Sequence, residues 1–60
     1  MKDAATKVLD ALLEGELTEQ EIAVNTLLAP TAVNNGLRNL LREGRVVRQD
    51  DNGVWLWRRV

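Results

Sequence analysis

The sequence predicts an α+β domain that is mostly α-helical, with three helices followed by a C-terminal β-hairpin. Apolar residues recur at helical spacing in three successive segments. Thr18 and Pro30 mark the starts of two of these helices, and Asn52-Gly53 separates two short stretches that contain valine or tryptophan. Sixty residues suffice for one small domain, which we expect to occupy residues 1–60.

The first helix is expected over about residues 2–14. Charged residues occupy its outer side, and Gly15 suits the position just past its end. Its apolar stripe consists of Ala5, Val8, Leu9 and Leu12. The pattern indicates a helix whose role is packing.

A capping box starts the second helix, which is expected over about residues 19–28. The Thr18 hydroxyl can accept a hydrogen bond from the Glu21 amide, and the Glu21 carboxylate can accept one from the Thr18 amide. Pro30 disfavours helical geometry at Ala29, so the helix ends before that residue. The residues expected to face inward are Ile22, Ala23 and Leu27.

The third helix, expected over about residues 30–43, has one apolar and one polar side. The apolar side consists of Val33, Leu37, Leu40 and Leu41; the polar side consists of Thr31, Asn35, Arg38 and Arg42, with Asn34 and Asn39 at its flanks. Asparagine offers a paired donor and acceptor, and arginine offers a planar fork of donors. We therefore interpret this segment as a recognition helix. Its expected base contacts are Thr31, Asn34, Asn35 and Arg38.

Gly36 lies inside this third helix, where glycine costs about 1 kcal/mol relative to alanine. We expect the missing side chain to let the second helix approach closely near Ala23. The alternative is that the glycine is incidental.

A β-hairpin is expected over about residues 45–59. Arg45–Arg48 is typical of a first strand and Gly53–Val60 of its partner, with residues 49–52 between them. Asn52 and Gly53 both tolerate the positive φ that a type I′ turn requires. The acids Asp50 and Asp51 near the tip repel phosphates. The expected phosphate contacts therefore lie on the hairpin stems and at the end of the third helix: Arg42, Arg48 and Arg58.

Trp55 and Trp57 are two positions apart and share one face of their strand. In one interpretation, at least one indole closes the bottom of the small core. In the other, Trp57 lies near Asn34 and Arg38, holds Arg38 by a cation–π contact and offers its ring edge to nucleic acid. An exposed indole could also be a dimer contact.

Charge is divided unevenly along the chain. The formal net charge is −1, but residues 1–28 hold two lysines against six acids, whereas residues 29–60 hold six arginines against three acids. The positive charge thus accompanies the expected recognition helix. A basic face on an acidic body is compatible with DNA binding of modest, salt-sensitive affinity.

The composition disfavours catalytic, metal-binding and membrane functions. The chain has no histidine and no cysteine, so the usual general base, thiol nucleophile and imidazole or thiolate ligands are missing. No apolar run approaches the roughly 20 residues of a membrane span, and no secretory leader is recognised. We expect a cytoplasmic binding domain that is not an enzyme and uses no cofactor, metal or small-molecule substrate.

Several of these positions resemble, spacing for spacing, the winged helix-turn-helix family. They are Leu17-Thr18, Ile22-Ala23, Ala29-Pro30-Thr31, Val33, Leu37, Leu40, Gly44 and Val46. The resemblance implies that Ala23 lets the third helix cross closely, that Val33 anchors it and that the hairpin is the wing. It departs from the family where Leu27 replaces the usual glycine of the turn and Ala29 replaces a serine or threonine cap.

The resemblance also implies a function. It indicates duplex DNA binding with the third helix in the major groove, by a small transcriptional regulator or the DNA-binding module of one. The alternative is a protein-interaction or dimerisation module that uses the same fold without direct DNA contact. With so few cations, a second copy of the chain or a larger protein is expected to assist binding.

A narrower resemblance concerns the Z-alpha domains, which are winged helices that bind left-handed DNA. Asn34, Arg38 and Trp57 fall at positions similar to the asparagine, tyrosine and tryptophan of that subtype. Arg38 replaces the tyrosine, and Val54-Trp55 stands where the subtype has a pair of prolines.

Overall fold

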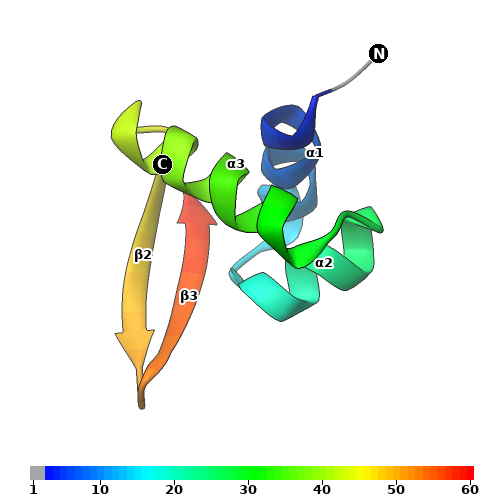
Figure 1. Cartoon of the computed structure of the whole chain (residues 1–60). Helices are drawn as coiled ribbons and strands as arrows, with labels where there is room; N and C mark the ends of the chain where they lie inside the picture. The colour runs from blue at the N-terminus through cyan, green and yellow to red at the C-terminus, as the bar shows by residue number, and fades with distance from the viewer. Residues whose placement is uncertain (1–2) are drawn as a thin grey trace.

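The computed structural model describes residues 3–60, which form a helical body with a sheet along one side. Figure 1 shows α3 running between the hairpin on one side and the first two helices on the other. Mostly helical with a small antiparallel sheet, the architecture confirms the expected fold class. Its elements are α1 (Ala4–Ala11), the 3₁₀ turn η1 (Leu12–Glu14), β1 (Leu17–Thr18), α2 (Glu19–Thr26), α3 (Pro30–Arg42), β2 (Val46–Asp51) and β3 (Val54–Arg59).

The α1 helix begins with a side-chain cap. Asp3 is the N-cap residue, and its Oδ1 atom accepts a hydrogen bond of 2.8 Å from the backbone N–H of Thr6. That bond lowers the pKa of the Asp3 carboxyl below its ordinary value. The expected helix start at Lys2 lies outside the described residues. At the other end, η1 tightens the last turn before Gly15.

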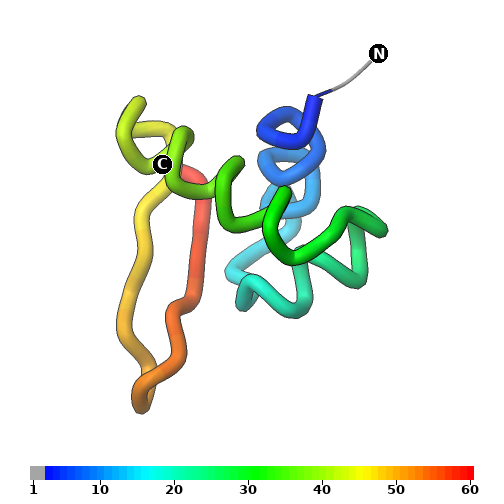
Figure 2. The backbone as a smooth tube through the Cα atoms, viewed as in Figure 1, coloured from blue at the N-terminus to red at the C-terminus, as the bar shows by residue number. Residues whose placement is uncertain are grey.

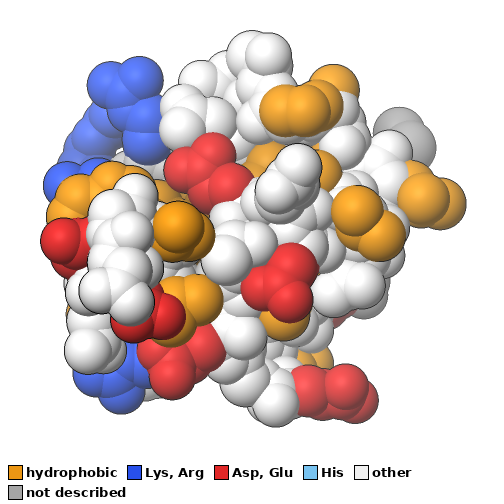
Figure 3. Space-filling view, turned by 90° about the horizontal axis from the view of Figure 1, so that it is seen from below, with side chains coloured by type: hydrophobic (Ala, Val, Ile, Leu, Met, Phe, Trp, Pro, Cys, Tyr) orange, Lys and Arg blue, Asp and Glu red, His pale blue; other side chains and the backbone are white. Residues whose placement is uncertain are grey.

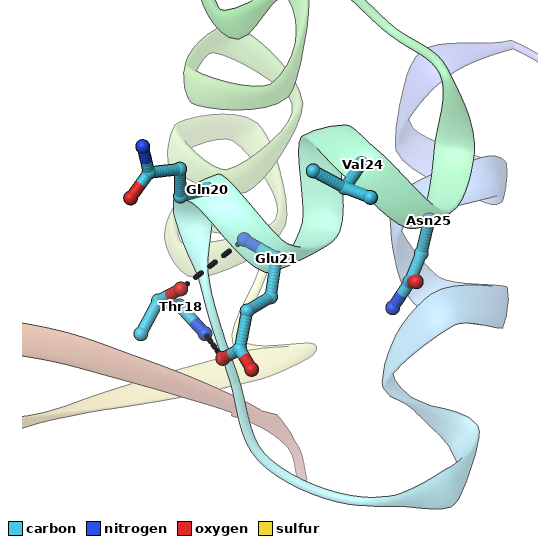
Figure 4. Close-up of a pocket in the computed structure, with 5 residues that line it drawn as sticks. All are labelled: Thr18, Gln20, Glu21, Val24 and Asn25. Carbon is cyan, nitrogen blue, oxygen red and sulfur yellow. Dashed lines mark hydrogen bonds between the residues drawn. The ribbon is translucent and has the colours of Figure 1, made fainter.

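The capping box at the start of α2 is confirmed. The Glu21 N–H donates to Thr18 Oγ1 at 3.1 Å, and the Thr18 N–H donates to Glu21 Oε1 at 2.9 Å (Figure 4). The helix ends at Thr26, two residues earlier than expected.

Leu27 was expected to face inward, and this expectation is wrong. Its backbone is left-handed with a φ of 60°, and its side chain is 91% exposed. The left-handed residue reverses the chain direction and turns its own side chain outward, so Leu28 packs partly against the core instead.

The α3 helix starts without a capping side chain, as the alanine at position 29 led us to expect. Pro30 occupies the first helical position, which suits its fixed φ and missing N–H. The expected partner of Gly36 is corrected, because α1 rather than α2 passes over it. A Cβ at that position would lie 3.5 Å from Val8 Cγ2 and 3.6 Å from Ala5 Cα.

The sheet is antiparallel, with β3 between β1 and β2. Asn52 and Gly53 have φ values of 54° and 84° and form the expected two-residue turn at the end of the hairpin (Figure 2). Residues 49–51, expected in the loop, instead belong to β2, because this tight turn lets Asp51 pair with Val54. The Asp50 carboxylate accepts the Gly53 N–H at 2.9 Å, so this acid helps to form the turn.

The core lies between the three helices and one face of the sheet. Trp57, its largest side chain, confirms that at least one indole closes the core. Within residues 3–60, no helix is long and apolar enough to cross a membrane. The buried residues are Val8, Leu9, Leu12, Ile22, Val33, Leu37, Leu40, Val46 and Trp57.

Candidate nucleic-acid interface

The polar side of α3 faces solvent along its whole length. Val33, Leu37 and Leu40 are buried against the other elements and fix the rotation of the helix. The rotation leaves Asn34 half-buried and places four of the expected contacts on the surface. These four are Thr31, Asn35, Arg38 and Arg42.

Asn34 is held by a neighbouring helix. Its Nδ2 atom lies 3.4 Å from Oε1 and 3.5 Å from Oε2 of Glu19, the first residue of α2. The contact joins the first turn of α2 to the first half of α3. Sequence reasoning assigned Glu19 only to the start of its helix and missed this contact, because the two residues are 15 positions apart.

Arg48 of β2 lies over two indoles of β3. Its guanidinium carbon is 4.4 Å from the ring centroid of Trp55 and 5.8 Å from that of Trp57. Arg48 pairs directly with Trp57 across the strands, and Trp55 is its diagonal neighbour. The two rings therefore hold the cation by cation–π contacts on the sheet face that carries the core residues.

Trp57 is not available for direct contact with a ligand, which corrects its assignment as an interface residue. It belongs to the central strand, packs into the core and is only 2% exposed. Its expected cation–π partner was Arg38, but Arg48 takes that place. The Trp57 Nε1 atom is buried and has no hydrogen-bond partner within the described residues.

Trp55 is the exposed indole of the pair, at 45% of its surface. Arg48 covers one part of the ring while the rest remains accessible. The alternation of side chains along β3 predicted that the two indoles share a face, but not which of them lies beyond the edge of the core.

Arg58 is separated from the other expected phosphate contacts. It pairs with Val47 and lies in the alternate set of residues, on the sheet face opposite Trp57 and Arg48. The structure thus brings Arg48 to the helix side of the sheet and leaves Arg58 exposed on the outer side.

Charge on the molecule follows the division seen in the sequence. On the face shown in Figure 3, lysine and arginine lie toward the left of the view, the side of the hairpin, where acidic side chains also lie; other acidic side chains are spread across the middle and the lower right. Within residues 3–60, neither Arg38 nor Arg42 has a carboxylate within 4.0 Å, in contrast to Arg45, whose guanidinium lies 4.0 Å from Glu43. The cations of α3 are therefore free to meet a polyanion.

Several surface hollows lie around α2. One of them, of about 450 Å³, is on the outer side of α2, where Val24 and Asn25 lie beside the capping box (Figure 4). Two smaller ones, of about 290 and 300 Å³, share Glu19 and Gln20; one extends to Trp55 near the hairpin tip and the other to Pro30 at the start of α3.

Residues 3–60 contain no cluster of three or more acidic, histidine or cysteine side chains suited to a metal ion.

No protein-family model matches the sequence, and no curated protein matches it either. Solved structures do match. The Zalpha domain of PKZ from Carassius auratus, determined in complex with Z-DNA, is 26% identical with a TM-score of 0.83, over 95% of this chain and 92% of that one.

A second similar structure is the homodimeric winged helix-turn-helix DNA-binding domain of a possible ArsR-family transcriptional regulator from Mycobacterium bovis. It is 25% identical with a TM-score of 0.84, over 93% of this chain and 52% of that one. This chain therefore spans about half of the second structure.

Proposed function

The chain is a winged helix-turn-helix domain, and from this premise we propose that it binds duplex DNA without catalysing a reaction. In the proposed complex, α3 lies in the major groove and the hairpin of β2 and β3, the wing, lies beside it. The observation that carries the proposal is the exposed polar side of α3, which has two cations unpaired with carboxylates and no acid before Glu43. One of the matching structures is bound to Z-DNA and another is of a DNA-binding domain, which supports the proposal.

The proposed contacts divide into two groups. Thr31, Asn35 and Arg38 reach base edges from the exposed side of α3, where Asn35 and Arg38 can make paired hydrogen bonds. Asn34 reaches a base edge from the half-buried flank of the helix, beside Glu19. Arg42 and Arg48 meet phosphates and position the domain. Arg58 contributes less, because it lies on the outer face of the sheet, and Trp57 acts only by holding Arg48.

We further propose that the domain acts as a small transcriptional regulator or as the DNA-binding module of one. A monomer that carries a net charge of −1 neutralises few phosphates, so its affinity is modest alone. Pairing with a second copy, or attachment to a larger protein, supplies the missing affinity. The homodimeric state of the Mycobacterium bovis domain supports this part of the proposal.

A second candidate function is protein interaction through α2 and the turn that follows it. Val24 is 70% exposed and Leu27 is 91% exposed, which is unusual for two large apolar side chains three positions apart. In this alternative, the fold is retained and a partner protein covers α2, with no role for the polar side of α3.

An NMR titration of backbone amides separates the two candidates. A short duplex is added at low salt and again at several-fold higher salt, and a second duplex that adopts the left-handed form tests the preference for DNA geometry. We expect shifts at residues 31–42 and at Arg48, fading as salt rises. Absence of shifts at low salt with both duplexes would refute DNA binding by the isolated domain.

A further inference from the structure

Glu19 occupies a position on the proposed DNA-binding side that none of the contacts above assigns. Both oxygens of its carboxylate lie within 3.5 Å of Asn34 Nδ2, and the side chain is half-buried. Because a carboxylate only accepts hydrogen bonds, the amide nitrogen of Asn34 must be the atom that faces it. The contact therefore fixes which way the Asn34 amide points.

Surface hollows flank Glu19 on the side on which DNA is proposed to bind. Glu19 lines both the hollow that reaches Trp55 and the hollow that reaches Pro30. It thus lies between the wing and the first turn of α3. Its own place in the first turn of α2 favours a negative charge, because unpaired backbone N–H groups point toward that end of the helix.

The negative charge of Glu19 determines which DNA group can approach Asn34. The carboxylate repels a phosphate that approaches the Asn34 amide. It accepts hydrogen bonds instead, and among the base edges of the major groove the exocyclic N4 amino group of cytosine is the donor that acidic side chains recognise. With the amide nitrogen directed to Glu19, the remaining Asn34 oxygen is a second acceptor beside the first.

We propose that Glu19 is a specificity-determining residue that, together with Asn34, reads a cytosine amino group and rejects a phosphate at the same place. The inference rests on the proposed function, because it needs α3 in the major groove. It goes further by assigning a base preference to one end of the interface and by giving a role to an acid on a surface that binds a polyanion.

The test is selection from short duplexes with a randomised core, followed by affinity measurements on the selected sequences. The Glu19→Gln variant keeps the side-chain length but offers a paired donor and acceptor, an arrangement that suits adenine. We expect the wild type to prefer cytosine at one position and the variant to lose that preference by about fivefold or more, with adenine gaining. Glu14→Gln is the matched control, because it removes the same charge from the exposed end of η1.

A second measurement tests the contact itself in the DNA-free protein. Glu19→Gln should shift the side-chain amide resonances of Asn34, whereas Glu14→Gln should leave them in place. Unmoved Asn34 resonances, or a base preference identical in wild type and Glu19→Gln, overturn the inference. Equal tightening of all duplexes by both variants also overturns it, since net charge alone then explains the effect. These results leave DNA binding intact, whereas a wild type that selects no duplex and binds none refutes the proposed function as well.

Discussion

The two tight turns of the molecule differ in how well their residues suit their backbones. In the wing, Asn52 and Gly53 have φ values of 54° and 84°, a region that both residues tolerate. Between α2 and α3, Leu27 adopts a φ of 60°, and Ala29 begins α3 without a capping oxygen. The wing turn is thus specified by its own residues, whereas the helix turn is imposed by the packing of the helices that it joins.

This difference shows where a small domain can tolerate unfavourable local chemistry. A left-handed conformation costs an ordinary residue about 1–2 kcal/mol, and a domain of this size has little stability to spare. Burial of Ile22 in α2 and Val33 in α3, on either side of the turn, offsets the conformational cost at Leu27. Within residues 3–60, no helix packs around the turn of the wing. The stability of the wing therefore depends on Trp57 at its base and on a favourable turn at its tip.

The largest expected effect follows from removing the anchor of the wing. Trp57→Ala should lower the free energy of unfolding by about 3–5 kcal/mol, because it empties a fully buried aromatic site. Chemical denaturation measures this loss. Trp55→Ala is the matched control on the same strand and should cost much less, since Trp55 is 45% exposed. Equal losses in the two variants would contradict a wing anchored by Trp57.

A smaller loss should follow from spoiling the wing turn. Gly53→Ala forces a side chain into a φ of 84° and should destabilise the domain by about 1–2 kcal/mol. No heavy atom lies within 4 Å of the added Cβ, so the loss would report backbone strain rather than a clash. Thermal unfolding measures the change, and an unaltered midpoint would show that the turn is not locally specified.

Leu27→Gly should stabilise the domain, in contrast to the two substitutions above. Glycine adopts the left-handed conformation without strain, so the variant should gain up to about 1 kcal/mol after the greater entropy of its unfolded chain is subtracted. The side chain is exposed, so little packing is lost. A loss of stability here would mean that Leu27 makes contacts that outweigh its strain.

Ala29→Ser should also stabilise the turn, by about 0.5–1 kcal/mol. The backbone at Ala29 is already extended with a ψ of 147°, the geometry in which a serine hydroxyl can accept an N–H of the first turn of α3. Hydrogen exchange of the first amides of α3 should slow in this variant. Unchanged exchange would indicate that the hydroxyl does not cap the helix.

Features set by local chemistry could be predicted from the sequence. The capping box of Thr18 and Glu21, the Asn52-Gly53 turn and the buried side of α3 all depend on residues close together in the chain. Features that depend on how helices and strands cross in space could not be predicted from the sequence. We expected the second helix to approach Gly36, but the residues that lie over this glycine belong to α1.

The candidate site divides in the same way. The exposed residues of α3 followed from its periodicity, whereas the alternation along β3 left open which tryptophan the core would bury. The contact between Glu19 and Asn34 depends on the crossing of α2 and α3, and no spacing in the sequence indicated it. The partner of Arg48 depends on the register of β2 and β3, which the length of the turn determines.

Because the two indoles differ in exposure, the intrinsic fluorescence of the protein can follow unfolding and binding separately. The chain has two tryptophans and no tyrosine or phenylalanine, so its ultraviolet emission comes from Trp55 and Trp57 alone. The emission of Trp57, which is 2% exposed, changes when the core unfolds. The emission of Trp55, which is 45% exposed, changes when a ligand covers the sheet face that carries Trp55 and Arg48. Emission from a Trp55→Phe variant therefore follows unfolding, and the difference from wild type follows occupancy of the wing, without any attached dye.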